Sequence, residues 1–335
     1  MPKTSATPTY TVYITSGVVK YDVTPVLISL EMSADMKKMA QSATIQLINI
    51  KAGPDYLTSI VKARDRVYIY ADDGNGKSEV FRGYVWTRVY KSSVNDREIS
   101  YKCYDQLIYL QESEDSVFFA SGKSTKDVCA DLCSRWGIKM EYSYESITHS
   151  KLALRGNLSD IFTSDVLDLA KDRSGKKYVI LSDKDTMYIK PWGSNKEIYR
   201  FLESSNVVRE SSGFTMDGMI TKVVIVGKSD DEGREPVEAT VSKDTDKYGT
   251  LQKIISRDSN TSLADAKKEA QEIIDENGKP KWEYEICAVD IPWIRLGDKV
   301  YVAAGDIHNR YLIVTAISRT IEAEKSEMII TMEDP

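Results

Sequence analysis

The sequence predicts a mainly β protein with a small α+β insertion, and three observations support this fold class. A set of four β-type segments occurs twice, once in the first third of the chain and once at the C-terminus. Short runs of branched and aromatic residues, separated by turn signals, surround both sets. Helix start and stop signals cluster between them. With 335 residues, the chain can form about two or three domains with cores of their own.

The repeated segments agree in order and in spacing. In the first set, ATIQLI at 43–48 precedes DRVYI at 65–69, FRGYVWT at 81–87 and ISYKCYD at 99–105. In the second set, YEICAV at 284–289 precedes DKVYV at 298–302, YLIVTAI at 311–317 and MIITMED at 328–334. Any single segment can recur by chance, whereas four in one order indicate two versions of one small β-domain. The alternative is two unrelated antiparallel sheets.

Residues 10–105 carry β patterns throughout. Strands are predicted at 26–30 and 43–48, where branched residues are frequent, with a polar connector at 33–40 between them. Hairpin turns are predicted at 72–76 and 92–96, because Gly and Asn accept positive φ at little cost. Six or seven strands at this spacing favour a barrel or a sandwich over residues 1–112.

Residues 113–198 have the pattern of a small α+β domain. Ser124 and Asp127 are spaced as a helix N-cap and its reciprocal partner, and Gly137 provides a stop signal. A second helix is predicted at about 159–171. It is followed by a hairpin with strands at 177–181 and 186–190.

Strand patterns resume in residues 199–335, the second predicted β-domain. Strands are predicted at 220–226 and 237–241, ahead of the second set of repeated segments. A helix is predicted at about 262–277, because Ser262 and Asp265 form a start signal and Asn-Gly-Lys-Pro at 277–280 forms an end signal.

Composition excludes several classes of function. The net charge is −6, with 45 basic and 51 acidic residues interspersed, so no basic patch for nucleic acid is expected. No run of about 18 apolar residues occurs, and residues 1–8 lack the apolar run of a signal peptide. We therefore expect that the protein is synthesised in the bacterial cytoplasm and that it does not insert into a membrane. The four cysteines lack the spacing of a disulfide framework.

The sequence contains no recognisable catalytic motif. Both histidines, His149 and His308, lie in polar stretches and are expected in solvated loops. Cys129 and Cys133 are spaced for one helix face, but no nearby pair completes a zinc site, so core packing is favoured. Carboxylate pairs for glycoside hydrolysis are the hardest alternative to exclude; the candidates lie in turn-like runs at 112–114 and 230–232. We expect no enzymatic activity, no metal ion and no cofactor.

The connector at 33–40 contains the only candidate interface residues, Met36 and Met39. Flexible methionine side chains adapt to irregular surfaces. They can insert into a neighbouring subunit or partner, or they can cover the chain's own β-domain; the sequence does not separate these alternatives.

Six short motifs, in order, resemble the XkdQ/YqbQ-like family of baseplate hub proteins from phage-like elements and contractile tails. The motifs are VFRGYVW at 80–86, YDQLIYL at 104–110, GKKYV at 175–179, YGTLQ at 248–252, RLGDKV at 295–300 and MEDP at 332–335. The resemblance implies two tube-protein-like antiparallel β-barrels flanking the α+β domain. It carries over no catalytic residue.

The resemblance also implies a function and partners. In such hubs a homotrimeric ring adapts the sixfold tail tube to the threefold spike, so the expected partners are further copies of the chain, the tail tube protein, the central spike protein and other baseplate proteins. A phage tail or a tail-like bacteriocin would be the final location. The alternatives are a tail-associated cell-wall hydrolase and a spike component, although the C-terminus shows none of the short regular periods typical of spikes.

Overall fold

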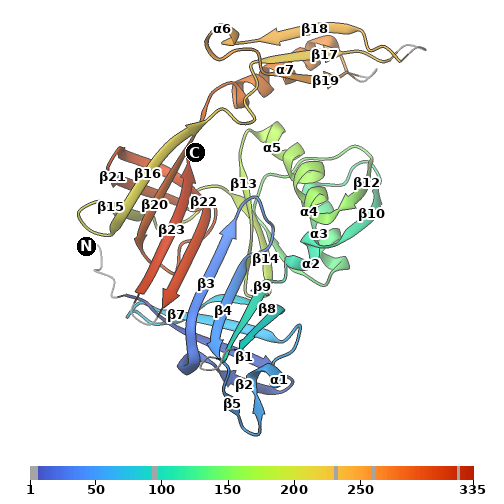
Figure 1. Cartoon of the computed structure of the whole chain (residues 1–335). Helices are drawn as coiled ribbons and strands as arrows, with labels where there is room; N and C mark the ends of the chain where they lie inside the picture. Colours follow the sequence, from blue (N-terminus) through green and yellow to red (C-terminus); the bar gives the residue numbers. More distant parts are fainter. Residues whose placement is uncertain (1–6, 93–96, 230–232, 258–260, 323–324) are drawn as a thin grey trace. The chain divides into compact units, whose positions relative to one another are not determined.

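The computed structural model describes residues 7–92, 97–229, 233–257, 261–322 and 325–335. The chain forms two compact units, and strands predominate, as the sequence predicts (Figure 1). The first unit combines Met1–Ser211 with Tyr284–Pro335, and the second unit is Ser212–Glu283. The second unit thus lies within the predicted domain 199–335. The boundaries of the three predicted domains stay predictions.

A 13-stranded sheet dominates the first unit. Its main path runs β16-β20-β23-β22-β3-β4-β9-β8-β7-β1-β2, with β21 beside β22 and β15 beside β21. The N-terminal strands are β1 (Thr9–Ser16), β2 (Val19–Asp22), β3 (Leu27–Asp35), β4 (Ser42–Ile48), β7 (Arg66–Asp72), β8 (Lys77–Ser92) and β9 (Arg97–Tyr104). The later strands are β15 (Tyr199–Leu202), β16 (Val207–Thr215), β20 (Lys281–Val289), β21 (Lys299–Ala304), β22 (Ile307–Glu322) and β23 (Lys325–Glu333). Both predicted β regions therefore share one sheet, and its described strands do not close into a hydrogen-bonded barrel.

The duplication predicted from the sequence is present in the strand order. In the first repeat, β4, β9, β8 and β7 are successive neighbours; in the second repeat, β20, β23, β22 and β21 are successive neighbours. All of these pairings are antiparallel. The registers also agree, because Ala43 pairs with Cys103 in the first repeat and Tyr284 with Met332 in the second. The repeats differ at one edge, where β1 joins β7 antiparallel and β15 joins β21 parallel.

The same turn leads into β7 and β21. Asp65 accepts from the Lys62 amide through its carboxylate at 2.8 Å, and Asp298 accepts from the Arg295 amide at 2.9 Å. The residue before each aspartate has positive φ, 70° at Arg64 and 77° at Gly297. A Cβ at Gly297 would lie 2.6 Å from Val179 Cγ1, so glycine is required there, whereas Arg64 is exposed.

A bulge bends the long third strand of each repeat. The amide and carbonyl of Val85 bond the turn at 64–65, and those of Val314 bond the turn at 297–298. The register with the next strand then shifts between Val85 and Thr87 and between Val314 and Ala316. The structural equivalence is therefore Val85 with Val314, one residue away from the alignment of FRGYVWT with YLIVTAI. Each bulge lets a 16-residue strand pair with different strands along its two halves.

Each repeat has its own apolar core. Fully buried side chains in the first core include Ile14, Ile45 and Ile69, and those in the second include Ile286, Val300 and Ile330. Cys103 and Cys287 are buried. The short elements β5 (Lys51–Ala52), β6 (Asp55–Tyr56), α1 (Leu57–Ile60) and the 3₁₀ turn η1 (Thr24–Val26) connect strands of the first repeat.

The α+β region contains the predicted helices and hairpin. Ser124 and Asp127 form the predicted capping box of α3 (Thr125–Arg135). The second helix is continuous through α4 (Leu158–Asp160), a π-helical segment η2 (Ile161–Leu167) and α5 (Asp168–Ser174). The predicted hairpin is β13 (Tyr178–Asp183) with β14 (Thr186–Pro191). The remaining elements are α2 (Ile108–Gln111), β10 (Glu114–Phe119), β11 (Lys139–Tyr142) and β12 (Leu152–Asn157).

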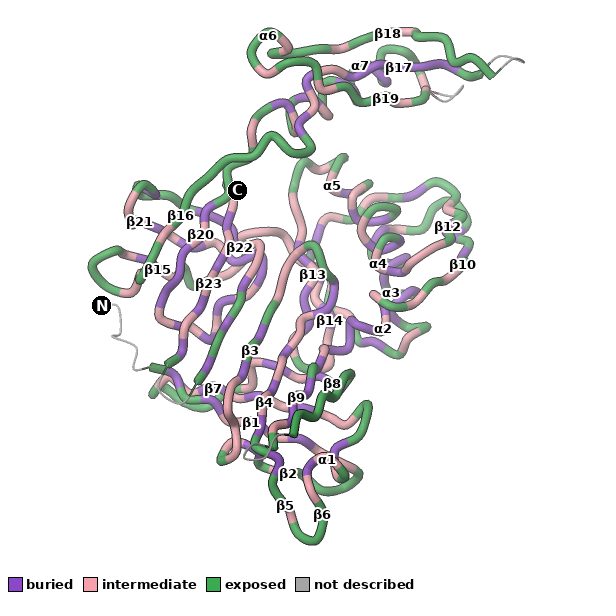
Figure 2. Tube along the Cα trace, viewed as in Figure 1, coloured by how far each residue is buried: buried purple, intermediate pink, exposed green. Residues whose placement is uncertain are grey.

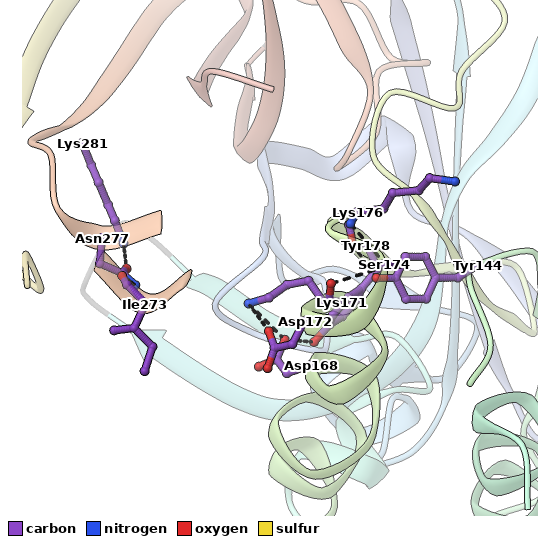
Figure 3. Close-up of polar contacts among 10 residues, drawn as sticks. All are labelled: Tyr144, Asp168, Lys171, Asp172, Ser174, Lys176, Tyr178, Ile273, Asn277 and Lys281. Carbon is purple, nitrogen blue, oxygen red and sulfur yellow. Dashed lines mark hydrogen bonds and ion pairs between the residues drawn. The ribbon is translucent and has the colours of Figure 1, made fainter. Parts of the chain in front are cut away.

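Polar contacts hold the end of this helix to the hairpin (Figure 3). The Tyr178 hydroxyl donates to Asp168 at 3.1 Å, and Lys171 forms an ion pair with the same carboxylate at 3.6 Å. The Tyr144 hydroxyl donates to the Lys176 carbonyl, directly after the helix. Burial raises the pKa of Tyr178, with the Asp168 charge as a second cause, so the phenol stays protonated and serves as a donor.

The second unit is a three-stranded sheet with a helix on one face. β17 (Lys222–Val226) lies between β18 (Val237–Ser242) and β19 (Gln252–Ser256). The predicted helix is α7 (Leu263–Asn277), capped by Ser262, and it buries Ala266, Ala270 and Ile274. Asn277 donates to the Ile273 carbonyl and accepts from Lys281 near the helix end (Figure 3). A short helix, α6 (Thr245–Tyr248), precedes β19.

Two local predictions need correction or fall outside the structure. Ser33, Ala34 and Asp35 are part of β3 and not of a polar connector, because they pair with β22. The predicted turn at 92–96 lies mostly outside the described residues.

Candidate functional site: a joint between the two repeats

The two repeats are joined edge to edge by β3 and β22 (Figure 1). These strands pair antiparallel over Leu30–Asp35 and Ala316–Ile321. The ladder continues where the Met36 amide donates to the Thr315 carbonyl at 2.9 Å. The second half of β22 thus bonds β23 on one edge and β3 on the other. A single strand thereby belongs to both repeats.

A buried charged cluster lies at this joint. Arg319 of β22 donates through Nε to Asp290 Oδ1 at 3.0 Å, and their side chains are 9% and 0% exposed. Arg319 Nη2 donates to the Ile294 carbonyl at 2.9 Å. Ser326 donates to Asp290 Oδ2 at 3.1 Å. The Asp290 carboxylate therefore has a cation and a hydroxyl as partners from the second repeat, as a buried charge requires.

The first repeat supplies another partner for the same carboxylate. The Tyr10 hydroxyl, on β1, donates to Asp290 Oδ2. Burial, followed by the charge of Asp290, raises the pKa of Tyr10, so this hydroxyl keeps its proton and donates. A second polar link joins Trp293 Nε1 to Asp73 Oδ2 at 2.9 Å, and this bond holds the pKa of Asp73 below its usual range.

Two ion pairs that share one carboxylate connect the α+β region to the first repeat. Asp185, in the turn between β13 and β14, accepts from Arg66 Nη2 at 2.7 Å and from Arg82 Nη1 at 2.5 Å. The two guanidinium groups lower the pKa of the Asp185 carboxyl, against the opposing effect of desolvation, which is the largest single cause. Gln41 also donates to the Ser182 carbonyl at 3.2 Å.

Both candidate interface methionines pack within the chain. Met39 is 7% exposed and belongs to the core of the α+β region. Met36 is half-buried against the core of the second repeat, directly after β3. The connector between β3 and β4 therefore packs against two parts of the chain. A contact of Met36 or Met39 with a partner stays a prediction.

Two strands of the sheet present open edges. Trp86, Val89 and Tyr90, in the second half of β8, are 42%, 48% and 46% exposed. β16 is the last strand at one end of the sheet, and Val208 on it is 64% exposed. The sequence did not identify these edges, because local periodicity and composition do not show whether a strand edge has a partner.

The residues considered for catalysis differ in burial. His149 was expected in a solvated loop, but it is 4% exposed and bonds Thr125 Oγ1 at 3.0 Å. His308 is exposed. Cys129 and Cys133 pack in the α+β core, as favoured, and burial raises their thiol pKa. Glu112 and Glu114 are both exposed, and residues 230–232 lie outside the described structure.

The described part of the chain contains no group of three His, Cys, Asp or Glu side chains arranged to hold a metal ion. None of its helices is long and apolar enough to cross a membrane.

The fold resembles those of solved phage tail proteins. The prophage MuSo2 43 kDa tail protein from Shewanella oneidensis matches with a TM-score of 0.72 and 15% identity, covering 98% of this chain and 99% of that chain. The tail protein from Neisseria meningitidis MC58 matches with a TM-score of 0.70 and 13% identity, covering 97% and 96%. The E. coli c3393 protein, described as a component of the type VI secretion system, matches with a TM-score of 0.58 and 9% identity, covering 92% and 74%. The chain thus has a phage-tail-protein fold.

The family can be stated more closely. A family model described as YQBQ-like matches residues 30–333. The chain therefore belongs to the YQBQ-like family, as the six motifs indicated. No curated protein matches the chain.

Proposed function

We propose that this protein is a structural hub of the baseplate in a contractile phage tail or phage-tail-like particle. In this proposal three copies form a ring that adapts the sixfold tail tube to the threefold spike. Its partners are two further copies of the chain, the tail tube protein, the central spike protein and other baseplate proteins.

One observation carries this proposal: the chain contains two copies of one β repeat joined edge to edge. A ring of three such chains offers six similar positions to a sixfold partner and three identical positions to a threefold partner. In that ring the two repeats of each chain take the places of the tube-like barrels that the family resemblance implies. Family membership and the phage-tail-protein fold support the same role.

A non-enzymatic role follows from the same observations. The buried charged groups of the joint have hydrogen-bond partners within the fold. Among the described candidates, His149 is buried and bonds Thr125, whereas His308, Glu112 and Glu114 are exposed. The buried charged cluster around Asp290 therefore has a structural explanation. The proposed location is the assembled particle.

Electron cryomicroscopy of the particle tests the proposal. The expected result is three copies of the chain in one ring on the tail axis, between tube and spike. A different copy number, or a position away from the axis, would contradict the hub role. The rival spike role predicts the chain at the distal tip. The rival cell-wall hydrolase role predicts peptidoglycan release by the purified chain, for which heat-denatured protein is the control.

A further inference from the structure

The two repeats in one chain are not equally covered at corresponding positions. With Val85 equivalent to Val314, the segment Thr87–Ser92 of β8 corresponds to Ala316–Ile321 of β22. The β22 segment pairs with β3 along its outer edge, whereas no described strand pairs with the corresponding edge of β8. In the first repeat, the edge of β8 that corresponds to the β22 edge of the joint therefore has no partner among the described strands.

Side-chain exposure agrees with this difference. Arg319 in the second repeat is 7% exposed, and its equivalent Tyr90 is 46% exposed. Ile317 is 2% exposed, and its equivalent Arg88 is exposed. The second half of β8 is accordingly green in Figure 2. An uncovered strand edge of this length is a template for pairing with another strand.

The backbone groups of β8 that face the open edge can be identified. The Asn49 amide donates to the Arg97 carbonyl, so Arg97 and alternate residues after it bond β4. Glu98, Ser100 and Lys102 therefore bond β8, through Lys91, Val89 and Thr87. This leaves the amides and carbonyls of Arg88, Tyr90 and Ser92 directed away from β9.

The complementary open edge belongs to β16. β3 lies beside β4 in the first repeat, and β16 lies beside β20, the equivalent of β4, in the second. Leu27 at the start of β3 pairs with Leu47 near the end of β4. Likewise the Val289 amide, at the end of β20, donates to Asn206, just before β16. β16 is thus the second repeat's version of β3, and its outer edge has no partner among the described strands.

We propose that the open edge of β8, Thr87–Ser92, pairs antiparallel with the open edge of β16 in a second copy of this chain. This pairing would have the geometry of the β22–β3 joint, in which β22 of the second repeat pairs antiparallel with β3 of the first repeat. This inference rests on the proposed ring, and it specifies which strands close that ring between chains. Three joints within chains then alternate with three joints between chains.

Cysteine cross-linking in the particle tests the pairing. Ser92 corresponds to Ile321, whose partner Leu30 lies near the start of β3, so Ser92 lies opposite the start of β16 in a second copy. The double variant Ser92→Cys/Val208→Cys replaces the native chain in the particle, and a short bis-maleimide is added. Both sites are exposed and all four native cysteines are buried, so the engineered thiols react selectively. The control is Lys20→Cys/Val208→Cys, with Lys20 on β2, the opposite end of the sheet.

The expected result is covalent dimers and trimers of the chain on a denaturing gel, on the order of tenfold above the control, because pairing holds the two thiols at a high effective concentration. Particles that contain three copies but give no more product than the control would overturn the pairing and leave the hub role intact. Particles that lack the chain, or contain another copy number, would overturn the hub role and the pairing together.

Discussion

Replacing Asp290 by alanine tests whether the charged cluster holds the two repeats together. The substitution removes the acceptor of Arg319 Nε, of Ser326 and of the Tyr10 hydroxyl. Arg319 keeps carbonyl partners but loses its counter-charge in a setting where its side chain is only 9% exposed. Removing one partner of a buried ion pair typically costs about 3–5 kcal/mol of unfolding free energy.

Urea unfolding of the full chain measures this effect. With an m value of about 3 kcal/mol/M, such a loss lowers the transition midpoint by about 1–2 M. Amide hydrogen exchange then shows where stability is lost, because the amides of β3 and β22 should lose protection together. Asp290→Ala with Arg319→Met should recover part of the loss, since no unpaired charge stays buried.

The matched control is Asp334→Ala. Asp334 pairs with Arg310 at 3.2 Å, and their side chains are 53% and 48% exposed, so its removal should hardly change the midpoint. The reasoning is refuted if Asp290→Ala and Asp334→Ala shift the midpoint equally.

Three further outcomes are expected. Gly83→Ala should lower the unfolding free energy by about 1–3 kcal/mol, because the added Cβ would lie 2.2 Å from the Tyr104 carbonyl oxygen. Gly213→Ala, where the added Cβ meets open space, should leave the unfolding free energy unchanged. Equal urea midpoints for the two variants would contradict this steric argument. Burial lowers the pKa of His149, so stability should be lost as pH falls below about 6.5, where the unfolded chain binds the proton first; thermal melts of His149→Gln should lack this loss. Burial raises the pKa of Asp105 to about 7, so its contribution to stability should decrease as pH rises from about 4 to 7. If thermal melts of Asp105→Asn show the same loss of stability over this pH range, another group causes the loss.

Local patterns made the repeated strands predictable from sequence. Asp65 and Asp298 end the same turn with the same backbone bonds, and each is followed by alternating buried residues. These features depend on neighbours within a few residues. The capping box at Ser124 was predictable for the same reason.

The joint between repeats depends on distant residues and has no such signal. Nothing around Arg319 or Asp290 indicates that they meet, and Asp290 meets Tyr10 across 280 residues. His149 was misassigned because its polar neighbours did not reveal the Thr125 hydroxyl that satisfies it in the interior. The one-residue offset of the third strand became apparent only from the backbone hydrogen bonds, which place Val85 and Val314 at the same bulge.

The pairing of β3 with β22 has a consequence for synthesis of the chain. A domain made first usually folds first, yet the outer edge of β3 must wait until nearly the whole chain has left the ribosome. Until then β3 is open to the β22 strand of another nascent chain on the same messenger RNA. The β22 strand of the same chain is favoured because it is covalently tethered to β3, although loop closure between strands so far apart in the sequence is slow. Translation rate and spacing between ribosomes should therefore control how much of the protein folds as single chains and how much exchanges strands.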